Sequence, residues 1–260
     1  MELIRLIFRL PLLLISTLFH VILIVAFYPL RFFGHSYAYV VGYFTQSWGR
    51  SLLAITGGKI KIQGTPPKPP FFLVSNHLSY VDIWVLFTCL RATFIAKHDL
   101  KHWPILGLAM RLGGIIFINR TNKTDIPRVN ELISRELTPA RGLIVFPEGT
   151  TTKGTELIPY NSPLFEIPAT LHQPVNAVIV TYTNKKGSDR SLDGESNVCW
   201  WDETSFSKHF LDLISKPGYI ATVTFSKVSW KSGNRKELRN HVFSWSKEQY
   251  DLMKKELFNT

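Results

Sequence analysis

His77 and Asp82 are separated by four residues and follow a short apolar run, which makes them the first candidates for catalysis. On one continuous helix, five steps of about 100° would leave the two side chains roughly 140° apart. They can meet if His77 lies in a loop and Asp82 lies in the first turn of the next helix. We expect Ser79 to be the N-cap of that helix and Asp82 its N3 residue, in a variant of the capping box.

General base chemistry is what this pair of side chains could perform. An aspartate in that place could accept the imidazole N–H, fix the tautomer and stabilise the imidazolium, which leaves the far ring nitrogen free to take a proton. In the alternative interpretation Asp82 only caps the helix, and His77 is an ordinary loop residue.

Two further polar clusters also follow apolar runs. Asn119 and Arg120 come after one run, and Glu148 and Gly149 come shortly after another. An arginine can hold a phosphate through paired, charge-assisted hydrogen bonds. The simpler alternatives are a surface charge for Arg120, a helix-start acid for Glu148 and a turn at Gly149.

The elements that would position these clusters alternate along the chain. Alternating residues predict a strand at 59–63 (KIKIQ), and short apolar runs predict strands at 71–75, 93–96, 115–118, 143–146 and 175–182. A late strand is expected at 219–228. Helical patterns lie near 81–90, 100–112, 125–137, 161–172 and 235–258. The alternation predicts an α/β fold, with a largely parallel or mixed sheet flanked by helices. In such sheets, ligands bind beyond the carboxyl ends of the strands, where all three clusters fall.

In their order and spacing, the three clusters resemble the sequence blocks of glycerolipid acyltransferases, in particular the 1-acyl-glycerol-3-phosphate (lysophosphatidate) acyltransferase group. The blocks are His77-x-x-x-x-Asp82, Gly114–Arg120 (GIIFINR) and Phe146–Thr150 (FPEGT). The resemblance covers roughly residues 50–185. It implies transfer of a fatty acyl group from acyl-CoA or acyl-acyl-carrier protein to the free sn-2 hydroxyl of 1-acyl-glycerol-3-phosphate, giving phosphatidate.

The resemblance also implies roles for individual residues. His77 would deprotonate the acceptor hydroxyl, Asp82 would orient His77, and Arg120 would bind the acceptor phosphate. The expected substrate-binding residues are Arg120, Glu148, Gly149, Thr150, Asn119 and Lys97. Lys97 matches a basic position that the family often has, although a solvated surface lysine is the competing interpretation. No covalent acyl-enzyme is expected, because the sequence has no G-x-S-x-G elbow and no cysteine near the motifs.

Two basic positions of the family pattern are missing. Thr151 stands where the family commonly has an arginine, and Asn161 stands where it often has a lysine. Lys153 could replace one of them. If it does not, the acceptor could be less anionic, for example lyso-ornithine lipid or another lysophospholipid. A non-catalytic lipid-binding membrane protein is a further alternative, which the intact His77 and Asp82 pair argues against.

An uncharged apolar stretch at 12–27 is interrupted only by the polar His20. Extended to 10–30, it would form a helix of roughly 32 Å, enough for a bilayer core. A cleaved signal peptide is disfavoured, because no small-x-small site follows. A spanning helix and a helical hairpin in one leaflet both remain open. The aromatic-rich stretch 32–53 predicts a second helix, either at the membrane interface or packed on the core.

We therefore expect a membrane-embedded helical segment at 1–57 and an acyltransferase domain at 58–260. The chain has a net charge of +11, and residues 1–120, with 12 basic and 3 acidic side chains, carry +9 of it. A basic region beside a membrane helix favours anionic lipid as its partner. Nucleic acid is not expected, because no docking element accompanies the charge. We expect the enzyme at the inner or cytoplasmic membrane, with its active site facing the cytoplasm.

Composition excludes several other classes of protein. Hydrophobic residues make up 45% of the chain, which is too many for a disordered protein, and two distant cysteines exclude a disulfide scaffold. No metal-ligand spacing occurs, so no metal or other cofactor is expected. The stretch Cys199–Asp202 (CWWD), with His209 nearby, resembles a feature of some bacterial members of the family. An aromatic packing patch is the alternative, and no catalytic role is assigned to it.

Overall fold

The computed structural model describes residues 1–33, 36–102, 106–118, 126–184, 189–194 and 196–258. A seven-stranded sheet has the strand order β1-β7-β6-β2-β5-β3-β4. Neighbouring strands pair in parallel, except β6 and β7, which are antiparallel. The strands are β1 (Lys59–Gln63), β2 (Phe72–Ser75), β3 (Ala92–Lys97), β4 (Ile116–Ile118), β5 (Gly142–Val145), β6 (Val175–Asn184) and β7 (Tyr219–Phe225). The expected α/β fold with a mixed sheet is confirmed.

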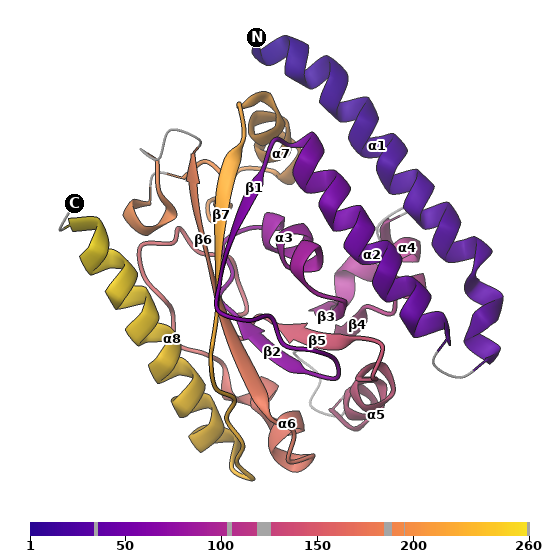
Figure 1. The fold of residues 1–260 in the computed structure, drawn as a ribbon, viewed down its shortest axis with the longest axis vertical. Helices are drawn as coiled ribbons and strands as arrows, with labels where there is room; N and C mark the ends of the chain where they lie inside the picture. The colour runs from indigo at the N-terminus through magenta and orange to yellow at the C-terminus, as the bar shows by residue number, and fades with distance from the viewer. Residues whose placement is uncertain (34–35, 103–105, 119–125, 185–188, 195, 259–260) are drawn as a thin grey trace.

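Helices cover both faces of this sheet (Figure 1). One face carries α2 (Ser36–Ile55), α3 (Val81–Cys89) and α7 (Phe206–Ser215), and the other carries α5 (Ile126–Glu136), α6 (Glu166–Thr170) and α8 (Arg235–Phe258). Strands β2 and β5 are buried at every residue, which explains their unbroken apolar sequences. Leu73 faces the α3 side, whereas its neighbours Phe72 and Val74 face the α8 side.

Several expected elements differ in detail. The helix expected at 100–112 is a 3-10 turn, η2 (His98–His102), followed by α4 (Leu106–Leu112), and the one expected at 161–172 is η4 (Ser162–Phe165) followed by α6. The late strand expected at 219–228 ends at Phe225. Helix α7 was not predicted. Two short 3-10 segments, η1 (Tyr28–Phe32) and η5 (Ser191–Asp193), complete the described elements.

Helix α1 (Glu2–Ala26) and α2 form a hairpin in which they run side by side in opposite directions (Figure 1). Polar side chains join them: the His20 Nε2 atom lies 3.2 Å from the Ser47 hydroxyl, and the Trp48 indole N–H donates to Thr17 at 3.1 Å. Their partners lie within the hairpin, which offsets the cost of burying polar groups among apolar side chains.

Helix α2 packs closely on α3, as the core-packing interpretation of this stretch predicts. A Cβ atom at Gly49 would lie 2.7 Å from the Trp84 carbonyl oxygen and 2.9 Å from the Phe87 Cβ. Only glycine therefore allows the two helices to approach this closely. Trp48 adds an edge-to-face contact with Phe87, with ring centroids 6.2 Å apart. The hairpin is thus joined directly to the helix that begins beside His77.

Helix α1 also contacts the rest of the molecule near its start. Arg5 donates to the carbonyl of Ser215 at 2.9 Å, and Arg9 donates to the carbonyls of Ile214 at 2.9 Å and Lys216 at 2.6 Å. These carbonyls end α7, where the helix dipole favours positive charge. Further along, α1 contacts α4. Helix α1 therefore lies along the domain instead of projecting away from it.

Candidate active site

The side chain of Asn76 holds the backbone in place directly after β2. The Asn76 side chain, only 1% exposed, donates to the Val180 carbonyl at 2.9 Å and accepts from the Val180 N–H at 2.8 Å. Because Val180 lies on the neighbouring strand β6, this amide continues the sheet pairing by side-chain bonds. His77, the next residue, therefore starts from a defined position at the carboxyl end of β2.

His77 and Asp82 meet. The His77 Nδ1 atom lies 2.8 Å from the Asp82 Oδ2 atom, and Asp82 is fully buried at 0% exposure. The same oxygen accepts the backbone N–H groups of Leu78 at 2.8 Å and Ser79 at 3.0 Å. An ionised carboxylate only accepts hydrogen bonds, so Nδ1 carries the ring proton and Nε2 is the nitrogen that can take one. The His77 side chain remains 20% exposed, so a substrate can reach it.

The expected helix cap is wrong. Helix α3 has Tyr80 as its N-cap, so Asp82 is the second residue of the helix and not the third, and the N-cap has no side-chain cap bond. The Ser79 hydroxyl is buried without a hydrogen-bond partner among the described residues. The physical reason is that the Asp82 N–H, which a Ser79 cap would accept, already donates to the Ser79 carbonyl at 3.1 Å. The Asp82 carboxylate instead accepts the N–H groups of Leu78 and Ser79.

The His77 ring stacks on Phe146, with centroids 4.0 Å apart and planes 18° apart. Phe146 in turn stacks on Phe94 at 5.5 Å and 11°. The aromatic side chains hold the imidazole plane while the Asp82 bond fixes its rotation. A low-dielectric surface also strengthens the electrostatic contact between His77 and Asp82.

Glu148 lies against the other side of the His77 loop. Its Oε1 atom accepts the His77 backbone N–H at 2.8 Å, and its Oε2 atom is buried with no partner among the described residues. Burial raises the pKa of Glu148 to about 8, although backbone hydrogen bonds from His77 and Ile158 oppose the shift. Glu148 is therefore mainly protonated at neutral pH. It follows β5 in a loop, so the helix-start alternative is wrong.

The loop after Glu148 folds back towards His77. Gly149 has a φ of +78°, which favours glycine and makes the turn, and Thr150 is exposed. The Thr152 backbone N–H then donates to the His77 carbonyl at 3.0 Å. Since β2 and β5 are neighbours in the sheet, the first and third sequence blocks come together at one edge.

Among the remaining expected residues, Lys97 is described and does not reach His77 or Asp82. Lys97 is 70% exposed and pairs with Asp99 at 3.0 Å, which favours the solvated interpretation. Asn119 and Arg120 lie outside the described residues. They follow β4, the outermost strand, which β5 and β3 separate from β2.

From the sequence, no catalytic role is assigned to the stretch with Trp200 and His209, which supports the site by hydrogen bonds. The Trp200 N–H donates to the Leu78 carbonyl at 2.9 Å, and the Tyr80 hydroxyl lies 2.9 Å from His209 Nδ1. His209 Nε2 donates to the Cys199 carbonyl at 3.1 Å, so Nδ1 accepts from Tyr80. The stretch 199–209 thus supports the loop that carries His77. The sequence had marked this stretch by its aromatic residues and by its resemblance to a feature of some bacterial family members.

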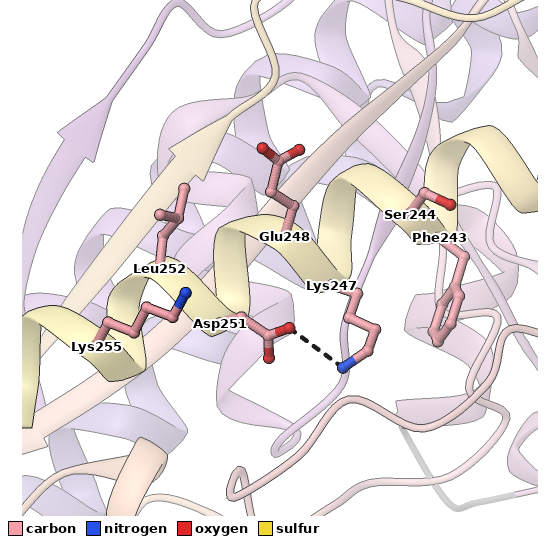
Figure 2. A pocket seen from close by; sticks show the side chains of 7 residues that line it. All are labelled: Phe243, Ser244, Lys247, Glu248, Asp251, Leu252 and Lys255. Atoms are coloured by element: carbon pink, nitrogen blue, oxygen red, sulfur yellow. Dashed lines mark hydrogen bonds and ion pairs between the residues drawn. The ribbon is translucent and has the colours of Figure 1, made fainter.

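Two hollows on the described surface lie away from His77 and Asp82. A shallow hollow on the exposed side of α8 is lined by polar and apolar side chains, among which Lys247 and Asp251 pair at 3.2 Å (Figure 2). Because α8 covers the sheet face opposite α3, this hollow is not part of the His77 site. Across the described ranges, no group of three or more His, Cys, Asp or Glu side chains could hold a metal ion.

Comparisons with known proteins give the class. A family model described as Acyltransferase matches residues 59–182. A lyso-ornithine lipid O-acyltransferase of Rhizobium meliloti is 30% identical over 202 residues, which are 74% of this chain and 69% of that protein. A 1-acyl-sn-glycerol-3-phosphate acyltransferase of Neisseria meningitidis is 29% identical over 166 residues, which are 62% of this chain and 65% of that protein. The chain thus matches less than two thirds of the Neisseria protein.

The crystal structure of the LPA acyltransferase PlsC from Thermotoga maritima has the same fold, with a TM-score of 0.64 at 17% identity over 98% of both chains. The matched segment and the Rhizobium relative define the family, and the solved structure shares the fold. The chain belongs to the acyltransferase family that this model describes, and its relatives there include both lysophosphatidate and lyso-ornithine lipid acyltransferases. The resemblance noted in the sequence is therefore confirmed.

Proposed function

We propose that this protein transfers a fatty acyl group from acyl-CoA or acyl-acyl-carrier protein to the sn-2 hydroxyl of 1-acyl-glycerol-3-phosphate, giving phosphatidate. The observation that carries the proposal is the 2.8 Å contact between His77 Nδ1 and the buried Asp82, in a chain of the acyltransferase family. A non-catalytic lipid-binding protein would have no need of such a base.

In the proposed reaction the acceptor O–H gives its proton to His77 Nε2 as its oxygen attacks the thioester carbonyl carbon. The C–S bond of the tetrahedral intermediate then breaks, and the departing sulfur takes the proton from Nε2. Asp82 stabilises the imidazolium between the two steps. General base catalysis of this kind contributes typically about 10²–10⁴ in rate.

The acceptor-binding residues keep the roles expected from the sequence. Glu148, protonated and with Oε2 unpartnered among the described residues, can donate a hydrogen bond to an acceptor oxygen beside His77. Gly149 and Thr150 follow it on the exposed side of the turn. Arg120 remains the proposed ligand of the acceptor phosphate, with Asn119 beside it.

Lyso-ornithine lipid is the second candidate acceptor, and one contact favours it. The Asn161 side chain, at a position where the family often has lysine, donates to the carbonyls of Pro147 at 2.9 Å and Glu148 at 3.3 Å. It therefore holds the loop and offers no positive charge to a phosphate. Lys153 is exposed, and its ammonium lies 5.3 Å from the centre of the Trp201 ring.

A panel of acceptors separates the two candidates. Membranes containing the full chain are supplied with radiolabelled acyl-CoA and, in turn, lysophosphatidate, lyso-ornithine lipid or lysophosphatidylethanolamine. We expect turnover with lysophosphatidate and a loss of roughly 10²–10⁴ in His77→Ala. His241→Ala, an exposed histidine on α8, is the matched control. Unchanged turnover in His77→Ala would show that His77 is not the general base. Lipid binding without turnover of any acceptor would favour the non-catalytic alternative.

We further propose that α1 lies in one leaflet and that residues 1–57 form the membrane-embedded segment. By length and composition, α1 is the one helix among the described residues that could cross a membrane. Its contacts with α7 and α4 hold it along the domain instead. Its exposed apolar side chains are Leu3, Ile4, Ile7, Phe8, Leu12, Leu14, Ile15, Leu18, Phe19, Ile22 and Val25. They would enter the apolar part of one leaflet.

The position of α1 can be tested with single cysteines. In sealed vesicles, an impermeant thiol reagent should label a cysteine placed at Glu2 and one placed at Phe33 from the same side. Labelling from opposite sides would show that α1 spans the bilayer.

A further inference from the structure

Tyr182 has a hydroxyl aimed at the buried side of Asp82. The phenol oxygen lies 2.5 Å from Asp82 Oδ1, and both residues are 0% exposed. Among the described residues this hydroxyl is the one donor to Oδ1, because the three N–H contacts of Asp82 all go to Oδ2. Burial, and next the Asp82 charge, raise the pKa of Tyr182 well above 10.0. The phenol therefore stays protonated and donates.

The position of Tyr182 is determined by the sheet. Successive side chains of a strand alternate between faces, and Val178, Val180 and Tyr182 share the face that α3 covers. The Tyr182 backbone N–H donates to the buried Ser191 hydroxyl at 3.0 Å, and its ring meets Tyr219 edge to face at 5.9 Å. The first contact fixes the backbone of Tyr182 and the second fixes its ring, both independently of Asp82. The hydroxyl is therefore held in place and does not merely follow the carboxylate.

We propose that Tyr182 is a positioning residue for the acyl transfer: its hydroxyl holds the Asp82 carboxylate in the orientation that presents His77 Nε2 to the acceptor. This inference rests on the proposed function. Tyr182 touches no substrate and acts only through Asp82 and His77. Without its hydroxyl, Oδ1 would be a buried carboxylate oxygen with no donor, and the carboxylate could rotate or take up a proton.

The pH profile shows whether Tyr182 acts in this way. In Tyr182→Phe the carboxylate loses a donor, so it binds the Nδ1 proton more strongly and stabilises the imidazolium. On the acid side of the profile, we expect the pH at which kcat reaches half its maximum to rise by roughly half a unit or more. We also expect kcat to fall roughly tenfold or more, as for loss of a hydrogen bond to a charged group, with little change in the acceptor KM.

The matched control is Tyr219→Phe. Tyr219 is equally buried and adjacent, but its hydroxyl contacts Thr56 at 3.2 Å and Trp84 at 2.8 Å and not Asp82. This variant should keep the wild-type pH midpoint, even if it is less stable. An equal shift in both variants would mean that general packing is responsible, and the inference would be overturned.

A second variant keeps the test decisive if Tyr182→Phe does not fold. Incorporation of 3,5-difluorotyrosine at position 182 keeps the ring and the hydroxyl but makes a stronger donor. It draws charge from Asp82, so the acid limb should move in the opposite direction, to lower pH. An unchanged profile in a folded variant would overturn the role of Tyr182. Full activity of His77→Ala would instead overturn the proposed function, so the two failures are distinguishable.

Discussion

Replacing Glu148 by glutamine removes a titrating group beside the His77 loop and nearly preserves its shape. The glutamine carbonyl can still accept the His77 backbone N–H, which Glu148 Oε1 accepts at 2.8 Å. The amide stays neutral at every pH, as the buried carboxyl is when protonated. Glu148→Gln therefore resembles the protonated form of the natural residue, and only the response to pH should change.

The magnitude follows from the two pKa values of Glu148. In the unfolded chain this carboxyl titrates near 4.5, and burial raises the pKa to about 8 in the folded protein. Between these values the folded state binds one more proton than the unfolded state, so the free energy of unfolding falls as the pH rises. The slope is about 1.4 kcal/mol per pH unit, so the total is at most about 5 kcal/mol. This contribution is fully present below pH 4.5 and is lost as the pH passes 8.

Denaturant unfolding of the detergent-solubilised protein at pH 5, 6, 7 and 8 measures this effect. Glu148→Gln and the wild type should agree within about 1 kcal/mol at pH 5, and the variant should be the more stable by several kcal/mol at pH 8. The titrations of all other groups are common to both proteins and cancel in the difference. Parallel stability curves from pH 5 to 8 would refute the raised pKa of Glu148 and the neutral carboxyl beside His77.

Three other perturbations have expected outcomes. Arg9→Ala removes three hydrogen bonds to carbonyls at and just after the end of α7, so it should lower stability by roughly 1–3 kcal/mol in thermal unfolding. Arg50→Ala, at an exposed arginine, should not, and equal effects would contradict the docking of α1. Gly149→Ala places a Cβ at a φ of +78° and should cost about 1–2 kcal/mol, with a larger loss of turnover; full turnover would argue against a role for this turn. Replacing Lys59, Lys61 and Lys68 by glutamine should weaken binding to anionic vesicles by about 1 kcal/mol for each lysine, but should leave binding to neutral vesicles unchanged. Unchanged flotation with anionic vesicles would contradict the expected basic surface.

Much of the fold could be predicted because its signals are local. Buried parallel strands need unbroken apolar runs, and each of the expected runs is a strand whose bounds shift by only a few residues. Helix α7 was missed because its sequence, Phe206–Ser215, follows an aromatic stretch that gives no clear start signal. Its Ser205 N-cap bonds the Lys208 N–H only at 3.4 Å, which is a weak cap.

The sequence by itself determined the class of protein and the meeting of His77 with Asp82, because the spacing of the two residues and the turn between strand and helix are local properties. Only the tertiary structure decided what surrounds that pair. Strand order makes β2 and β5 neighbours, which brings Glu148 to the His77 amide. Tyr182 reaches Asp82 from 100 residues further along the chain. Contacts between segments so distant depend on how the strands assemble, and no local pattern of residues encodes that order.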